Sequence, residues 1–415
     1  MHTTIESYGS LRPAAGRRRL LRSLSVGAGL ATLLSVAACH RGRAPAEERA
    51  RRARTSTADL VLAAAWPWSS QREAGFGSGI AMATDEVNAA GGLLGRKVHI
   101  EQIDDHGAVD DGELAAQRIA AEPNVIGVIG HLQSYISVPA ASIYDAAGLV
   151  MLAPATTDPE LTAHGYGHVF RETFTDRVVG EEMARFAQAK GYKRIAIYYV
   201  RDTYGRGLAN AFEQEAGRLG LSIAARAAYD PSDDVTAQSF TTLVAAIHPF
   251  DIDAIFLAGE VPTAGALIAA LRVAGVKAPI LGGDAMSSNA LIRSAGSAAE
   301  GTVVASMFSP NEPRAEVQQF STMFQRRFGV PPDAAAALGY DAVRLFAEAI
   351  RTAHSAVPED VTRALHNLHD WHGVTGAFTF DRNGDPVHKP VVRLVVSHGR
   401  FEYAGSTAPL RAVSR

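Results

Sequence analysis

The most constraining feature of this sequence is a regular alternation of short apolar runs with helical patterns. The apolar runs are aliphatic or β-branched and lie at residues 60–65, 98–103, 125–129 and 149–152. Between them, the apolar periodicity predicts helices at residues 79–89, 112–121 and 136–147. Strands that alternate with helices of about ten residues predict right-handed β-α-β units and a parallel sheet covered on both faces.

The same pattern starts again near residue 178 and predicts a second unit of the same kind. Strands are expected at residues 194–200, 222–229, 254–258 and 279–282. Helices are expected at residues 178–190, 208–219, 236–247 and 263–274. A chain of 415 residues exceeds what one hydrophobic core usually serves, so its length agrees with two domains.

The last part of the chain returns to strands after these two units. Further elements are expected at residues 302–308, 316–328 and 334–352, followed by a hairpin over 378–385 that turns at Asn383 and Gly384 and a last apolar run at 391–396. Such a tail predicts that the chain crosses between two lobes more than once. The expected fold class is therefore α/β, with two doubly wound lobes joined by a multi-strand hinge that closes around a ligand.

The first 39 residues have the pattern of an export signal. Basic residues 17–19 and Arg22 precede an apolar stretch of small residues at 24–38, which is short for a transmembrane helix. Cys39, the only cysteine, follows small residues directly, as in a bacterial lipoprotein box, so we expect cleavage after residue 38 and lipid attachment at Cys39. The alternative is an incidental cysteine, and the arginines leave Sec and twin-arginine export open.

Removal of the signal makes the chain more acidic. Residues 1–38 carry five arginines and one glutamate, so cleavage moves the formal net charge from −3 to −7. An acidic exported protein argues against nucleic-acid binding. Residues 40–57 are rich in Arg, Ala and Glu and predict either a flexible tether beside an anionic membrane or an ordinary solvated linker.

Polar residues follow several of the predicted strands, at the edge where parallel sheets bind ligands. They lie in segments 130–134, 155–157, 202–205, 259–262 and 283–285. Ser134 and Thr157 lie near predicted helix starts, where free amides and the helix dipole favour a carboxylate, whereas Asp284 favours a cation. Taken singly, each is more simply a helix cap or a turn residue. Their recurrence at corresponding strand ends favours a site for a zwitterion.

Short motifs along the chain carry a family resemblance. They are Gly-Gly-Leu-Leu-Gly-Arg-Lys-Val at 91–98, Asp-Asp at 104–105, Gly-His-Leu at 130–132, Pro-Ala-Thr-Thr-Asp-Pro-Glu-Leu-Thr at 154–162, Tyr-Gly-Arg-Gly at 204–207 and Ala-Glu-Gly at 299–301. Together they resemble branched-chain amino-acid binding proteins, the type I periplasmic solute receptors of ABC importers. The similarity extends over residues 58–403 and is most specific at 130–162. It implies the type I periplasmic binding protein fold, no cofactor, a monomer and an ABC permease as partner.

The resemblance also implies roles for individual residues. In this family the ligand's α-carboxylate is held at the position of Ser134, and its ammonium is held by the carbonyl of Ala155, by Thr157 and by Asp284, where the family usually has glutamate. A tyrosine at the position of Tyr204 closes the pocket from the second lobe. The remaining candidate ligand contacts are neighbours of these positions or of the first strand, namely Gln133, Tyr135, Thr156, Glu260, Arg72 and Trp68.

Two positions depart from the branched-chain pattern. Glu260 stands where an aromatic residue is usual, and Arg72 aligns with another aromatic position of the first lobe. Trp66 and Trp68 crowd the end of the first strand, and Gln133 replaces a cysteine of the family's disulfide. A carboxylate in the side-chain pocket is costly for leucine, because it loses water without gaining a partner. It suits a polar or cationic ligand side chain, or an internal pair with Arg72.

These observations predict a lipid-anchored receptor that delivers an amino-acid-type ligand to a membrane importer. The expected organisation is a signal at 1–38, a tether at 39–57, one lobe at 58–175 and 307–388, a second lobe at 176–306 and 389–405, and a tail at 406–415. A sensory receptor of the same fold, acting on a signalling partner, is the alternative. Gene neighbours would separate the two.

Other groups of residues give only weak indications of a metal, nucleotide or catalytic site. His366, His369 and His372 have spacing that occurs in zinc sites, but they are more simply the solvated end of a helix. The glycines at 75–79 lack dinucleotide spacing, and the acidic turn at 381–385 lacks a calcium loop's final glutamate. Ser134, His131 and Asp284 lack the nucleophile-elbow motif that a triad of this kind requires. We therefore expect no enzyme and no metal site.

Overall fold

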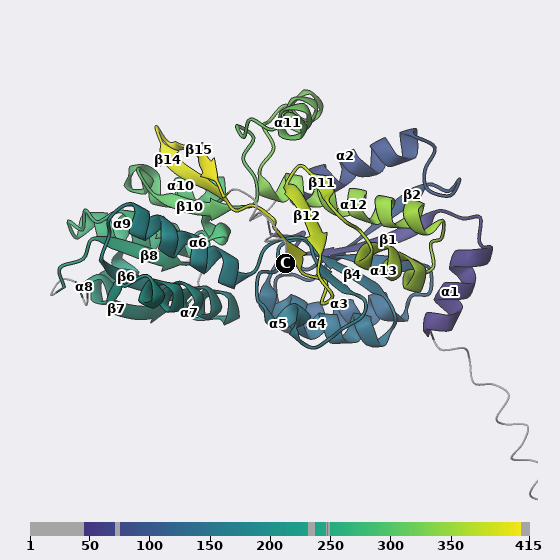
Figure 1. Cartoon of the computed structure of the whole chain (residues 1–415), viewed down its shortest axis with the longest axis horizontal. Helices are drawn as coiled ribbons and strands as arrows, with labels where there is room; N and C mark the ends of the chain where they lie inside the picture. Colours follow the sequence, from purple (N-terminus) through teal and green to yellow (C-terminus); the bar gives the residue numbers. More distant parts are fainter. Residues whose placement is uncertain (1–44, 71–74, 231–236, 246, 248–249, 408–415) are drawn as a thin grey trace, which may run out of the picture. The chain divides into compact units, whose positions relative to one another are not determined.

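The computed structural model describes residues 45–70, 75–230, 237–245, 247 and 250–407 (Figure 1). The predicted signal segment, Cys39, Arg72 and most of the predicted tail lie outside these ranges. Within them, no helix combines the length and the apolar character needed to cross a membrane.

The first large sheet has five parallel strands in the order β2-β1-β3-β4-β5. Their bounds are β1 (Leu60–Trp66), β2 (Val98–Asp104), β3 (Val125–Gly130), β4 (Val150–Ala153) and β5 (Val169–Arg171). The helices packed with it are α2 (Gly75–Ala89), α3 (Val109–Ala121), α4 (Ser134–Ala146), α12 (Ala334–Ala353) and α13 (Pro358–His366). Every residue of β3 and β4 is buried, as expected for central strands covered on both faces.

One close contact in this unit requires glycine. Helices α2 and α12 pack against each other, and a Cβ at Gly79 would lie 1.9 Å from the carbonyl oxygen of Ala336. The backbones can therefore approach only because Gly79 has no side chain. This packing explains the glycines near residue 79 as a helix contact rather than a nucleotide loop.

The second large sheet has seven strands in the order β15-β14-β10-β9-β8-β6-β7. Their bounds are β6 (Arg194–Val200), β7 (Ser222–Tyr229), β8 (Ala254–Ala258), β9 (Ile280–Gly282), β10 (Val303–Ser306), β14 (Val392–Ser397) and β15 (Arg400–Ser406). Strands β6 to β10 are parallel, whereas β14 and β15 join antiparallel at the edge, drawn in yellow beside β10 in Figure 1. The larger helices of this unit are α6 (Asp176–Ala189), α7 (Thr203–Arg218), α9 (Thr263–Val273) and α10 (Asn289–Ala295).

The chain passes between the two large sheets three times, after β5, after β10 and after β13. Between the second and third passages it forms α11 (Ala315–Phe328), α12, α13 and a small sheet of β11 (Trp371–Gly373), β12 (Gly376–Phe380) and β13 (Pro386–Val387). The α/β class with two doubly wound units is confirmed. Strands β6, β7 and β8 have the predicted bounds.

Other elements differ from the sequence predictions. The helix expected at 236–247 is divided into a 3-10 turn at Ala237–Phe240 and a short helix, α8 (Thr241–Ala245). Strand β5 and helix α10 were not predicted, whereas the short helix α5 (Glu160–Ala163) lies where a helix start was expected after Thr157. The three histidines do not share a helix, because α13 ends at His366 and His372 lies in β11. Among the described residues, no group of three or more side chains is arranged to hold a metal.

The flexible tether predicted over residues 39–57 is wrong for most of its length. Residues Pro45–Thr55 form α1, and the side chain of Arg49 is fully buried. Its guanidinium donates to the carbonyl oxygens of Val125 at 2.7 Å, Ala147 at 2.8 Å and Ala120 at 2.7 Å. A polar, arginine-rich segment therefore docks as a helix because one arginine satisfies carbonyls that the ends of neighbouring elements leave open.

Candidate functional site

One cavity collects side chains from the strand ends of both large sheets. It has a volume of about 100 Å³, several times the roughly 10–15 Å³ that one water occupies, so it has the size of a small-molecule site. Its polar lining residues are Gln133, Ser134, Thr157, Tyr204, Glu260, Asp284 and Ser287, the last of which was not predicted. Its larger apolar lining residues are Trp66, Leu132, Val261, Met307 and Leu338. The structure therefore brings together six predicted polar residues, and Ala155 lines the same cavity.

Ser134 is the first residue of α4, directly after the loop that leaves β3. The helix cap is Gln133, whose side chain makes no capping hydrogen bond, so Ser134 is not the cap. The serine is buried and lines the cavity beside the first amides of the helix. A hydroxyl and free amides at a helix start favour an anion such as a carboxylate.

Thr157 belongs to the turn that follows β4. The carboxylate of Asp158 accepts a hydrogen bond from the amide of Glu160 at 3.0 Å, so Asp158 stabilises the start of α5. Thr157 is therefore not needed as a cap, and its nearly fully buried side chain lines the cavity. Its carbonyl oxygen accepts from the amide of Asp176 at 2.8 Å, which ties the turn to the start of α6.

Arg171 holds the same turn from beneath. This fully buried residue ends β5 and donates to the carbonyl oxygens of Thr156 at 2.6 Å and Asp158 at 2.8 Å. Its Nε lies 2.8 Å from Oδ1 of Asp385 in the turn between β12 and β13. Sequence reasoning missed Arg171, because β5 has only three residues and Asp385 lies far along the chain.

Tyr204 and Asp284 form the other side of the cavity. The Tyr204 hydroxyl donates to Oδ1 of Asp284 at 3.3 Å and accepts from the amide of Ala285 at 3.2 Å. Asp202 caps α7 by accepting from the amide of Gly205 at 2.7 Å, which fixes the turn that carries Tyr204. A Cβ at Gly283 would lie 2.5 Å from the Tyr204 oxygen, so the close approach of this pair requires glycine there.

The electrostatics of the site favour a cation. Burial raises the pKa of Asp284 to about 6. Asp176, fully buried at the start of α6, has its pKa raised by burial and then by the charge of Asp284. The pKa of Tyr204 is raised by burial and by Asp284, Asp176 and Glu260, so its hydroxyl remains a donor. Several carboxyl groups around one small cavity favour a positively charged ligand group.

Asp176 was not among the predicted residues. Its carboxyl oxygen would lie 3.0 Å from a Cβ at Gly207 of α7, and its amide binds the turn of Thr157. It therefore lies next to both sides of the cavity without lining it. The sequence signal that could have found it is an aspartate just after a helix cap, but Thr175 is that cap and the pattern is common.

Three predicted ligand contacts do not line the cavity. Thr156 is fully buried, and its hydroxyl binds Ser137 rather than facing the cavity. The Tyr135 hydroxyl donates to the carbonyl oxygen of Gly107 at 3.2 Å. Trp68 donates from Nε1 to the carbonyl oxygen of Ala64 at 3.0 Å, and Trp66 lines the cavity instead.

Trp66 is the last residue of β1, one residue beyond the predicted end of the strand. Alternation alone would place Trp66 and Trp68 on the same face, but the chain turns at Pro67, where the Trp68 amide donates to the Trp66 carbonyl oxygen at 2.8 Å, so Trp68 leaves the strand. The Trp66 ring stacks on Phe76 with a centroid distance of 3.7 Å. Met307 and Leu338 complete the apolar wall from elements far along the chain, and no local pattern marks them.

A catalytic triad of Ser134, His131 and Asp284 does not fit this geometry. The ring of His131 is fully buried and does not line the cavity. Its Nδ1 lies 2.7 Å from Oδ2 of Asp105, and its Nε2 lies 3.1 Å from the Tyr144 hydroxyl. Both ring nitrogens are therefore engaged away from Ser134.

Comparisons with known proteins agree with this geometry. The family described as periplasmic binding protein matches residues 67–398, which include Ser134, Thr157, Tyr204 and Asp284. A Leu/Ile/Val-binding protein homolog 2 of Brucella abortus is 30% identical over 349 residues, covering 81% of this chain and 90% of the relative. The Leu/Ile/Val-binding protein of Escherichia coli is 33% identical over 230 residues, covering 55% of this chain and 61% of that protein.

Solved structures show the same fold. An ABC transporter substrate-binding protein from Desulfitobacterium hafniense, solved in complex with Leu, is 38% identical with a TM-score of 0.74 and covers 83% of this chain and 99% of that one. A leucine-binding protein from Thermotoga maritima is 27% identical with a TM-score of 0.78, covering 84% and 99%.

Proposed function

The chain belongs to the periplasmic binding protein family, as its motifs predict, and from that premise we propose that it is an extracytoplasmic receptor for an amino-acid-type ligand. The family consists of solute-binding proteins rather than enzymes, with the two-lobed type I fold. We assign one lobe to residues 58–175 and 307–388 and the other to residues 176–306 and 389–405. The ligand binds between them, and its binding shifts the population toward the closed form.

The observation that carries this proposal is the cavity with opposite chemistry on its two sides. Ser134, beside the first amides of α4, suits a carboxylate. Asp284, oriented by Tyr204, suits an ammonium group, with the Ala155 carbonyl and the Thr157 hydroxyl as further acceptors. Charged hydrogen bonds of this kind contribute about 1.5–3 kcal/mol each. A small zwitterion would satisfy both sides at once.

We further propose that the ligand is not restricted to branched-chain amino acids. Glu260 contributes a carboxylate to the lining, where the family pattern has an aromatic residue. Burying a carboxylate beside an aliphatic side chain costs free energy. Glu260 suits a polar or cationic ligand side chain.

The cellular role follows from the chain's N-terminal pattern and its family. We propose that residues 1–38 direct export, that Cys39 carries a lipid in the bacterial envelope, and that the receptor delivers its ligand to an ABC permease. Because α1 starts at Pro45 and is docked, only residues 40–44 separate the proposed lipid from the folded protein. The receptor would then work close to the membrane that holds the permease.

A thermal-shift screen of the protein lacking residues 1–38 tests the ligand class. The panel is the twenty proteinogenic L-amino acids, small amines and small carboxylates. A ligand present at 100 times its dissociation constant adds about 2.7 kcal/mol to the free energy of unfolding, which is readily visible as a higher melting temperature. A shift by one or more amino acids supports the proposal, and no shift by any of them overturns it.

A further inference from the structure

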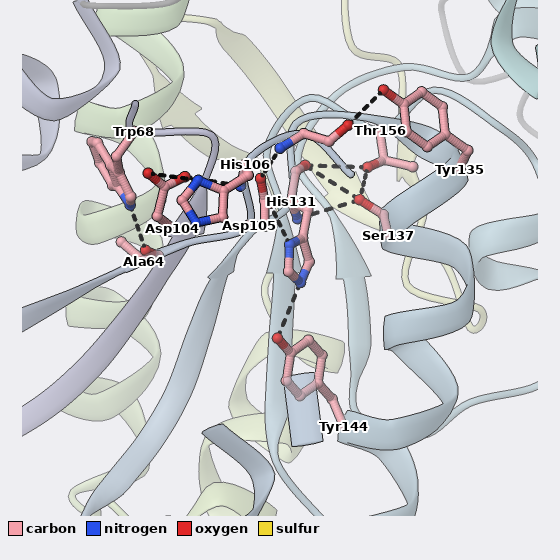
Figure 2. A network of polar contacts seen from close by, with 11 residues as sticks. Ala64, Trp68, Asp104, Asp105, His106, His131, Tyr135, Ser137, Tyr144 and Thr156 are labelled. Carbon is pink, nitrogen blue, oxygen red and sulfur yellow. Dashed lines mark hydrogen bonds and ion pairs between the residues drawn. The ribbon is translucent and has the colours of Figure 1, made fainter. Parts of the chain in front are cut away.

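A buried hydrogen-bond network joins the loops that follow β2, β3 and β4, next in sequence to residues that line the cavity. We call it the loop network, and Figure 2 shows its members and their contacts. It consists of five fully buried side chains, Asp105, His131, Ser137, Tyr144 and Thr156. Asp105 follows β2, His131 follows β3, and Thr156 follows β4. None of the five lines the cavity.

The imidazole of His131 connects the first two loops to helix α4. Its Nδ1 lies 2.7 Å from Oδ2 of Asp105, and its Nε2 lies 3.1 Å from the hydroxyl of Tyr144. An ionised Asp105 carboxylate only accepts, so Nδ1–H donates to it. Burial raises the pKa of Tyr144, so its hydroxyl keeps its proton beside Nε2.

The backbone of His131 connects the second loop to the third. The Ser137 hydroxyl accepts from the His131 amide at 3.2 Å. The Thr156 hydroxyl lies 2.5 Å from the Ser137 hydroxyl. The Thr156 hydroxyl also lies 3.4 Å from the His131 carbonyl oxygen. Every contact therefore ends on a residue of the binding loops or of α4.

The network residues are adjacent in sequence to residues that line the cavity. His131 immediately precedes Leu132, Gln133 and Ser134, which line the cavity. Thr156 lies between Ala155 and Thr157, which line it too. The inward-facing residues fix the backbone from which the cavity-facing residues project.

We propose that the loop network is a positioning device that fixes the Ser134 loop and the Ala155–Thr157 turn relative to each other and so sets the affinity for both ends of the ligand. This inference rests on the proposed function, because it takes Ser134 and Thr157 as ligand contacts. His131, Tyr144, Ser137 and Thr156 act through those residues and are positioning residues.

A purely stabilising role would need no such network. Well-packed apolar side chains of similar volume stabilise a core as well as buried polar groups do, and often better. Directional hydrogen bonds, in contrast, specify one arrangement of the groups they join. Displacement of a binding group by about 1 Å is enough to lose much of its contribution. If the network positions the binding groups, removing one of its hydroxyls should lower ligand affinity by more than its effect on stability explains.

The test compares hydroxyl removals inside and outside the network. Tyr144→Phe and Ser137→Ala each remove one hydroxyl of the network. Tyr198→Phe removes a buried hydroxyl that donates to the carbonyl oxygen of Leu243 in the other unit, and Ser142→Ala removes an exposed hydroxyl of α4. The probes are the twenty L-amino acids, titrated by calorimetry, and each melting temperature is recorded without ligand.

Tyr144→Phe and Ser137→Ala are expected to weaken binding about tenfold, the equivalent of one well-placed hydrogen bond, and the two controls less than about twofold. Thr156→Val is expected to weaken binding similarly, whereas Thr156→Ser, which keeps the hydroxyl, is expected to bind like the unaltered protein. This pair keeps the test decisive if another variant fails to fold.

The possible outcomes distinguish a failure of the positioning role from a failure of the proposed amino-acid binding. If Tyr144→Phe and Thr156→Val melt at lower temperature but bind with unchanged affinity, the network only stabilises the protein and the inference is overturned. If the unaltered protein binds no amino acid, the proposed function fails and the inference fails with it. Loss of affinity at Thr156→Val with recovery at Thr156→Ser supports positioning.

Discussion

The hydroxyl of Tyr204 donates a hydrogen bond to Oδ1 of Asp284 over 3.3 Å, and it accepts one from the amide of Ala285. Tyr204 begins α7 and Asp284 follows β9, so the bond joins two separate connections of the seven-stranded sheet. It orients the carboxylate at the cavity before any ligand arrives. A preoriented acceptor binds more tightly, because less freedom is lost on binding.

Because of Asp284, the free energy of unfolding should fall as pH rises, whereas the affinity for the ligand should rise. Its pKa is about 6 in the folded protein against an ordinary value of 3.8, so the folded state holds the proton more tightly. The free energy of unfolding should fall by about 2 kcal/mol as pH rises from 4 to 6. Binding of an ammonium group requires the carboxylate, so affinity should rise about tenfold from pH 5 to pH 7. Calorimetric titrations and denaturant unfolding at several pH values check both slopes.

Asp284→Asn is the control for this prediction. It should raise the free energy of unfolding at pH 7, because a buried charge is removed, and should weaken amino-acid binding about tenfold to a hundredfold. It should also remove the affinity slope. Any remaining stability slope belongs to other buried carboxyl groups whose pKa is raised in the same direction, such as Asp176 and Glu172. An unchanged affinity slope in Asp284→Asn contradicts the assignment of the ammonium site.

Glu260 should decide which side chains the cavity accepts. Glu260→Leu is expected to raise the affinity for leucine at least tenfold relative to that for polar or basic amino acids, because a carboxylate of the cavity lining no longer opposes an aliphatic group. Glu260→Gln, which keeps the shape, separates charge from size. Competition titrations against leucine and lysine measure the ratio. If leucine binds the unaltered protein tightly and Glu260→Leu leaves the ratio unchanged, Glu260 is not a specificity residue.

Two buried ionisable side chains, Lys389 and Glu172, lie at two of the crossovers between the sheets and interact electrostatically. Lys389 precedes β14 and donates to the Thr375 hydroxyl at 2.8 Å, and burial lowers its pKa to about 8. Burial raises the pKa of Glu172, which follows β5, while the charge of Lys389 opposes this rise. Lys389→Met should lower the free energy of unfolding by about 3 kcal/mol, because it leaves a buried carboxylate without its cation.

Lys389→Met combined with Glu172→Gln should recover most of that loss. Denaturant unfolding of the two single variants and the double variant gives the coupling free energy. Strictly additive losses would mean that the two side chains do not interact.

Arg49 should hold α1 on the protein. Arg49→Met removes the donors to three carbonyl groups and should expose α1 to trypsin at Arg51, Arg52 and Arg54. Mass spectrometry after brief digestion measures the cleavage. Arg54→Met changes an exposed arginine of the same helix and should leave the remaining sites protected. Equal cleavage of both variants and the unaltered protein would show that Arg49 does not retain the helix.

The extent to which the sequence predicts this structure depends on how local each signal is. Strands β6, β7 and β8 were predicted to the residue, because each is a mostly apolar run bounded by turn residues. The cavity-lining residues at strand ends follow from the geometry of parallel sheets and from the family motifs. These parts need no knowledge of distant contacts.

The remainder depends on contacts that only the folded chain creates. From the sequence alone, Arg49 is expected to be solvated. Only the folded structure shows that the carbonyl oxygen of Val125 lies next to its guanidinium. Arg171 binds Asp385 across the sequence, and Thr156 turns inward to Ser137 although its neighbours face the cavity. The orientation of single residues also determines that Trp66, and not Trp68, lines the cavity. Sequence patterns identify the loops of the site, and packing decides which of their residues face the ligand.

The most direct measurement compares one amino acid with two analogues that each lack one charged group. The protein without residues 1–38 is titrated by calorimetry with the L-amino acid that binds it most tightly, with the corresponding amine and with the corresponding deaminated acid. We predict that each analogue binds at least a hundredfold more weakly, that Ser134→Ala narrows the gap only for the amine, and that Asp284→Asn narrows it only for the deaminated acid. An analogue that binds as tightly as the amino acid would contradict recognition of a zwitterion by this cavity.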